Sequence, residues 1–128
     1  MTIADTTDGD TGWDLSFIAS TFNGPTGQSF GGNQLGYKIA TSQNAPFQYT
    51  DGSGATQTYS QAVTHVGSDV EEGTLGAAGA GNNRAVASAA AGHGLGIATV
   101  DARVKLLIPV TAKHGVYTGT LTITALSR

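Results

Sequence analysis

Alternation of apolar and polar residues is the feature of this sequence that most limits what it can fold into. In the segment 12–22, one set of alternate positions holds Trp13, Leu15, Phe17 and Ala19. The intervening positions hold Asp14, Ser16, Ile18 and Ser20. Successive side chains of a strand point to opposite faces, so a period of two residues separates these two sets. The segment is therefore predicted to be a strand with one buried face.

Two further segments near the C-terminus alternate in the same way. In 100–109 the predicted inward residues are Val100, Ala102, Val104, Leu106 and Ile108, and Pro109 ends the strand because it cannot donate to a ladder. In 116–126 the predicted inward residues are Tyr117, Leu121, Ile123 and Ala125. Only a short turn at 112–115 separates the two segments, so we expect them to pair as an antiparallel hairpin.

The rest of the chain contains shorter strand signals and turns. Strands are predicted at 35–41 and 56–66, with a loop at 51–54. The Gly- and Ala-rich segment 73–96 has no amphipathic stripe, and we interpret it as a loop with a short strand. Short alternating strands without convincing helices predict one all-β domain over 1–128. The expected architecture is an antiparallel, two-sheet β-sandwich of the immunoglobulin-like type, and a barrel is the alternative.

Composition excludes several classes of function. The chain has no cysteine, which removes disulfides, thiol catalysis and cysteine-based metal sites. Its six basic residues are scattered, and nucleic-acid binding normally needs a basic stripe. No apolar run is long enough to cross a bilayer, so we expect no membrane insertion. No nucleophile elbow or phosphate-binding loop occurs, so we expect no enzymatic activity.

The two ends of the chain resemble a known family. An Asp-led, Gly-containing loop at 5–12 runs into Gly-Trp-Asp-Leu at 12–15. Near the other end, Leu-Leu-Ile-Pro at 106–109 precedes Ala-Lys-His-Gly-Val-Tyr at 112–117 and Thr-Leu-Thr at 120–122. Both segments are similar to the WxL domain, which is associated with the cell wall of Gram-positive bacteria. The family's second Trp-x-Leu is replaced here by Ile-Thr-Ala at 123–125, so the chain resembles a divergent member.

The resemblance implies a function and a location. It implies a non-catalytic cell-surface module, excised from a longer secreted protein, that associates non-covalently with the wall through peptidoglycan. The expected location is extracellular, and the expected partners are wall glycan or other surface proteins, with homo-oligomerisation as a further option. A structural or adhesive β-sandwich module without glycan binding of its own is the alternative.

Four residues are candidates for ligand binding, namely Trp13, Asp14, Leu15 and Tyr117. An exposed indole can stack on sugar rings, whereas an indole in phase with other apolar residues packs in the core. The phase of Trp13 with Leu15 favours the core, and both interpretations stay open.

One acidic cluster is a candidate for a metal. Asp5, Asp8 and Asp10 supply the oxygen ligands that Ca²⁺ prefers. Their spacing lacks the EF-hand pattern, and Asp and Gly are also ordinary turn formers. We therefore predict no metal and no cofactor, with calcium at these residues as the alternative.

Overall fold

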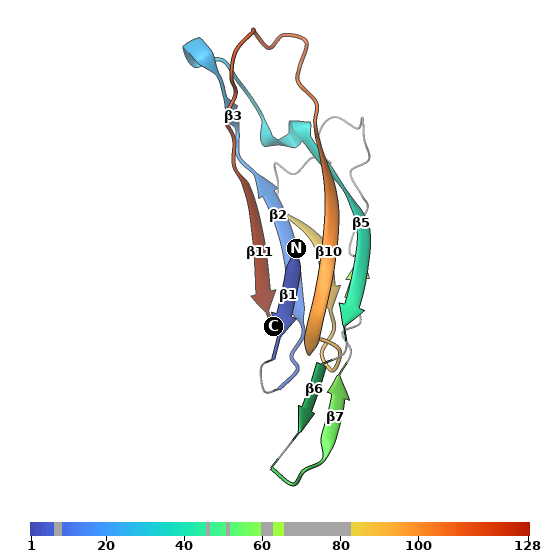
Figure 1. Cartoon of the computed structure of the whole chain (residues 1–128). Coiled ribbons are helices and arrows are strands. Elements are labelled where there is room, and N and C mark those ends of the chain that lie inside the picture. Colours follow the sequence, from blue (N-terminus) through green and yellow to red (C-terminus); the bar gives the residue numbers. More distant parts are fainter. Residues whose placement is uncertain (7–8, 46, 51, 60–62, 66–82) are drawn as a thin grey trace.

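The computed structural model describes residues 1–6, 9–45, 47–50, 52–59, 63–65 and 83–128 (Figure 1). The strands within these residues are β1 (Thr2–Asp5), β2 (Trp13–Ala19), β3 (Phe22–Asn23), β4 (Ser29–Phe30), β5 (Leu35–Ala45), β6 (Phe47–Thr50), β7 (Thr56–Tyr59), β8 (Val63–His65), β9 (Arg84–Ala89), β10 (Gly96–Leu106) and β11 (Leu121–Ser127). Two short 3₁₀ helices, η1 (Pro25–Gly27) and η2 (Gly32–Gln34), complete the described structure.

The strands form two main sheets, and every described pairing is antiparallel. One sheet has the order β1-β10-β5 and the other has the order β11-β2-β9-β8. Two small hairpins, β3-β4 and β6-β7, lie at opposite ends of the molecule (Figure 1). The predicted all-β, antiparallel class is confirmed. Among the described strands neither main sheet closes on itself, which disfavours the barrel alternative.

The core is built on the inward face of β2. The side chains of Trp13, Leu15, Phe17 and Ala19 are buried, as their alternation predicts. The same sheet contributes Val86, Ala87 and Ala89 from β9, and the other sheet contributes Leu35, Tyr37, Ala98 and Val100. One cluster of buried residues therefore draws on both main sheets.

The predicted hairpin between the two C-terminal segments is wrong. Strand β10 pairs with β1 and β5, whereas β11 pairs with β2. The last strand begins at Leu121 rather than Val116, so the connection after β10 spans residues 107–120. This connection is long enough to carry the chain from one sheet to the other, so the two strands need not pair (Figure 1).

The inward face of β10 is predicted only in part. Val100 is fully buried and Ala102 and Leu106 are half-buried, but Val104 and Ile108 are exposed. Beside β10, strand β1 pairs only from Thr2 to Asp5, and two hydrogen bonds then join Met1 and Val100. Beyond Val100 the apolar residues still alternate, but no strand covers the inward face of β10 completely, so Val104 stays exposed.

The shorter predicted strands are all represented in the structure. The segment predicted at 35–41 continues to Ala45, and the one predicted at 56–66 contains β7 and β8. The predicted loop at 51–54 contains a turn over the described residues 52–54. The Gly- and Ala-rich segment contains the predicted short strand as β9, and its part from 73 to 82 lies outside the described residues.

Candidate binding surfaces

Trp13 lies in the core, with 2% of its surface exposed. Its register partners on the two flanking strands are Ala89 and Ser127. Paired residues share a face of the sheet, so these two small side chains leave room for the indole between them. The core interpretation of Trp13 is confirmed, and the equally buried Leu15 lies on the same face. Neither side chain offers a ring or a surface to an external sugar in this conformation.

Asp14 lies on the opposite face of β2 and binds the last residue of the chain. The Nε of Arg128 donates to Asp14 Oδ2 at 2.7 Å, and a second guanidinium nitrogen bonds to Oδ1. This hydrogen bonding from Arg128 lowers the pKa of Asp14, and the carboxylate in turn raises the pKa of Arg128. The backbone N–H of Arg128 also donates to the carbonyl of Gly12 at 3.0 Å. Asp14 therefore fixes the end of β11 against β2.

Tyr117 anchors the long connection between β10 and β11. Its ring lies 5.0 Å from the ring of Phe30, which stacks in turn on Phe22 at 5.2 Å. Its hydroxyl donates to the carbonyl of Lys113 at 3.0 Å. A Cβ added to Gly24 would lie 2.3 Å from the Tyr117 ring, so the close approach of this ring requires glycine. Tyr117 is half-buried and holds its loop in place.

The four predicted ligand-binding residues do not form one site. Trp13 and Leu15 face the core, and Asp14 faces outward from the same strand. Tyr117 precedes β11, whereas the register partner of Trp13 is Ser127 at the far end of that strand. The long axis of β11 thus separates Tyr117 from the other three residues (Figure 1).

Of the three acidic residues, Asp10 stabilises the loop in which it lies. The Oδ1 of Asp10 accepts a hydrogen bond from the N–H of Gly94 at 2.6 Å, and its carbonyl accepts one from Gly92. Asp5 is buried on β1, and Asp8 lies outside the described residues. Across the described part of the chain, no group of three or more acidic or histidine side chains is placed to hold a metal ion. The contacts of Asp10 are those of a turn-forming residue.

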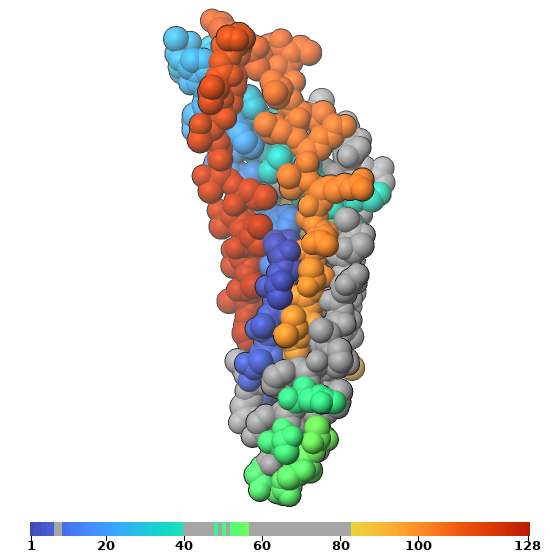
Figure 2. All heavy atoms as spheres, viewed as in Figure 1, coloured from blue at the N-terminus to red at the C-terminus, as the bar shows by residue number. Residues whose placement is uncertain are grey.

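An exposed apolar loop was missed by the sequence analysis. Val110 is 102% exposed and Val116 is 82% exposed, and Ile108 is exposed on the same connection. We call these three residues the apolar tip, because their loop extends beyond the two main sheets (Figures 1 and 2). The signal is present in the sequence, since the apolar run at 106–110 continues past Pro109, where the strand is predicted to end. Three exposed apolar side chains on one connection make this loop a candidate interaction surface.

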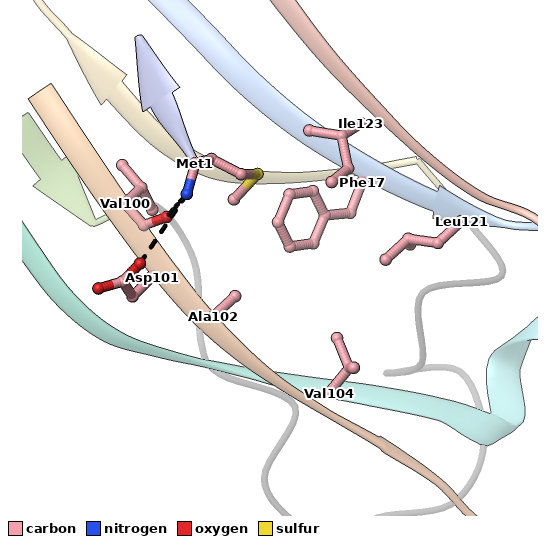
Figure 3. Close-up of a pocket in the computed structure, with 8 residues that line it drawn as sticks. All are labelled: Met1, Phe17, Val100, Asp101, Ala102, Val104, Leu121 and Ile123. Atoms are coloured by element: carbon pink, nitrogen blue, oxygen red, sulfur yellow. Dashed lines mark hydrogen bonds and ion pairs between the residues drawn. The ribbon is translucent and has the colours of Figure 1, made fainter.

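A groove lies between β11 and β10. Its volume is about 420 Å³, and the residues that line it are Met1, Phe17, Val100, Asp101, Ala102, Val104, Leu121 and Ile123 (Figure 3). The N-terminal ammonium donates to the carbonyl of Val100 at 2.8 Å and lies 3.9 Å from a carboxylate oxygen of Asp101. We call this feature the edge groove. Asp101 is the one ionisable side chain of its lining, and the remainder of the lining is apolar apart from backbone groups.

Comparisons of the chain with protein-family models, curated proteins and solved structures give no match. The resemblance to the WxL domain therefore stays a prediction that rests on the residues themselves. Among the described residues, no helix has the length and apolar character needed to span a membrane.

Proposed function

We propose that this protein is a non-catalytic cell-surface module of the WxL type that associates non-covalently with the bacterial cell wall. Support comes from the placement of the two segments that carry the resemblance. Strand β11 begins within the second segment and pairs with β2 of the first, from Leu121 opposite Ala19 to Ser127 opposite Trp13. Segments that lie far apart in the sequence thus build one edge of the molecule together.

The proposal includes the finer architecture, a two-sheet sandwich of the immunoglobulin-like type. Its support is the single buried cluster to which β2 and β9 of one sheet, and β5 and β10 of the other, contribute. The contact between the rings of Phe17 and Tyr37 joins the two sheets.

Wall contact through the apolar tip is the next step of the proposal. The observation that carries it is the exposure of Val110 and Val116 on a loop that Tyr117 anchors. An anchored loop loses little conformational entropy on binding, so even a small apolar contact can contribute to affinity. Wall polymer repeats its units, and clustered copies of a weak binder gain avidity through effective concentration.

Co-sedimentation with purified peptidoglycan tests this function. We expect the chain to be retained more than an inert protein of similar size, with and without EDTA. The double variant Val110→Ser, Val116→Ser should lose most of this retention. Ile18→Ser, Ile97→Ser is the matched control, because both of its residues are partly exposed apolar side chains on the sheets. Equal loss in both variants would contradict a role for the tip, and loss on adding EDTA would instead favour a calcium site.

The second candidate is a structural or adhesive module that does not bind glycan itself. The burial of Trp13 favours it, because the only tryptophan of the chain is withdrawn from the surface. No retention of the wild-type chain on peptidoglycan would support this candidate and refute the first.

A further inference from the structure

Strand β11 is an open edge of its sheet. The sheet order is β11-β2-β9-β8, and the described residues place no strand on the other side of β11. Strand β1 lies next to β11 in Figure 1 but belongs to the other sheet, where it pairs with β10. Open edges of this kind are where further strands can add.

The hydrogen-bond pattern between β11 and β2 determines which backbone groups of β11 are free to bond to a further strand. Thr120 accepts a hydrogen bond from Ser20, and Arg128 donates one to Gly12, so even-numbered residues bond to β2. Alternate residues of an antiparallel strand bond to the same neighbour. The N–H and C=O groups of Leu121, Ile123 and Ala125 therefore point to the open side of the strand.

The edge carries none of the features that normally prevent strand addition. Its sequence, Leu-Thr-Ile-Thr-Ala-Leu-Ser, contains neither a charge nor a proline, and its pairing with β2 has no register shift. Natural edge strands are commonly protected by charges, prolines or bulges. The part of β10 beyond Val100, where β1 no longer pairs with it, shows the contrast, because it carries Asp101, Arg103 and Lys105.

The edge groove lies on the inward side of this edge. Ile123 is 45% exposed and Val104 is 53% exposed, and both line the groove with Phe17 at its base (Figure 3). In Figure 2, β1 fills the lower part of the space between β11 and β10, and the surface above it is hollowed. A strand added beside β11 would place its inward side chains over this hollow.

We propose that a second copy of this chain binds here, through antiparallel pairing of β11 with β11 about a two-fold axis at Thr124. In this register Thr124 faces Thr124, Ile123 faces Ala125, and Leu121 faces Ser127 of the second copy. The odd-numbered residues then form the hydrogen-bonded pairs, which is the phase that the open side requires. The inference goes beyond the proposed wall association and does not depend on it.

Self-pairing is favoured over another partner by the symmetry and charge of the edge. About a two-fold axis, the free N–H and C=O groups of β11 hydrogen-bond to the same groups of β11 in the second copy. Closed symmetric dimers of this kind are the commonest oligomers. The pairing brings no like charges together, since Arg128 already binds Asp14 and would face Thr120 of the second copy. Ile123 of each copy would contribute apolar surface beside the groove of the other.

The absence of cysteine makes disulfide trapping a direct test. In the proposed register, Thr124→Cys places two thiols opposite each other in a non-hydrogen-bonded pair, where Cα atoms lie about 4.5 Å apart. Thr122→Cys is the matched control, because it is equally exposed on the same face but lies off the axis. Oxidation of Thr124→Cys should give a covalent dimer in high yield, and Thr122→Cys should give little. Equal yields, or a higher yield for Thr122→Cys, would overturn the proposed register.

Mass measurement by light scattering tests association without the disulfide. The wild-type chain should reach twice its mass of 12.9 kDa as its concentration rises. Ile123→Lys introduces like charges at the edge, and Ala125→Pro removes an N–H that points away from β2, so both should stay monomeric. Circular dichroism verifies that each variant is folded, and either folded variant suffices. A wild-type mass that stays at one chain at every concentration would overturn the proposal.

Discussion

The rings of Phe17 and Tyr37 meet edge to face, with their centroids 5.4 Å apart and their planes inclined by 72°. Phe17 belongs to β2 and Tyr37 to β5, so the contact joins the two main sheets. Both side chains are buried, and Phe17 also forms the base of the edge groove. This pair links the stability of the core to the surface on which a second copy is proposed to bind.

A double-mutant cycle on this pair should measure its coupling. Phe17→Leu and Tyr37→Leu should each lower the free energy of unfolding, because each removes a buried ring. The double variant should lose less than the sum of the two, with a coupling energy of about 0.5–1.5 kcal/mol from the ring contact. Urea unfolding curves provide the four free energies. A coupling energy near zero would contradict a direct contact between the rings.

The burial of Trp13 predicts a simple fluorescence signal. The chain has one tryptophan, so its emission should lie at short wavelength in the folded protein and shift to longer wavelength on unfolding. Acrylamide should quench it poorly until the chain unfolds. Trp13→Ala should cost about 3–5 kcal/mol through the cavity it leaves. Strong quenching of the folded protein would contradict the core position.

Peptidoglycan should leave this emission unchanged under the proposed function, because the apolar tip and Trp13 lie at opposite ends of β11. A shift in the emission of Trp13 on adding peptidoglycan would instead place the wall contact near the start of β2.

The sequence predicts which side chains share one face of a strand, but it does not predict whether other strands bury that face. Along β2 the alternation identified all four buried residues, because that face is packed against the core along the whole strand. Along β10 the same alternation continues through Val104, which is exposed beside the open groove. Periodicity indicates which side chains share a face, and only the packing of distant strands decides whether that face is buried.

Strand partners and the candidate surfaces depended on contacts that the local pattern does not contain. The hairpin predicted at 100–126 failed because β11 pairs with β2, about a hundred positions earlier in the chain. The same holds for Asp14, whose partner Arg128 is 114 residues away. Tyr117 was identified as a candidate, but its contact with Gly24 is equally long-range. Closing such distant contacts costs chain entropy that no short motif reveals.

The ion pair between Asp14 and Arg128 should make stability depend on pH in the acid range. Hydrogen bonding to Arg128 lowers the pKa of Asp14, so the folded protein binds this proton less readily than the unfolded chain. The stabilisation is therefore present above the unfolded value of about 3.9 and is lost as the pH falls through the lower folded pKa. Both side chains are largely exposed, so the effect should be small and should shrink with salt.

Thermal unfolding of Asp14→Asn and Arg128→Gln should reveal this dependence. Each variant should melt below the wild type near neutral pH, and the difference should narrow as the pH falls below the ordinary aspartate pKa of about 3.9. Because both variants remove the same bond, they should behave alike. A difference that stays constant through the acid range would mean that Asp14 acts by packing rather than by charge.

Gly12 should tolerate substitution far less than a glycine in an open turn. Its φ of +81° is a conformation that side chains disfavour, and an added Cβ would lie 2.4 Å from the carbonyl oxygen of Ala89. Gly12→Ala should therefore destabilise the protein by more than about 2 kcal/mol, through backbone strain and forced separation of β2 from β9. Gly52→Ala is the control, since no atom lies within 4 Å of its added Cβ, and it should change stability by less than about 0.5 kcal/mol.

Because the Gly12 carbonyl also accepts the N–H of Arg128, Gly12→Ala should loosen the end of β11, which hydrogen exchange at Arg128 can measure. Unchanged exchange at Arg128 in Gly12→Ala would show that β11 is held to β2 without this glycine.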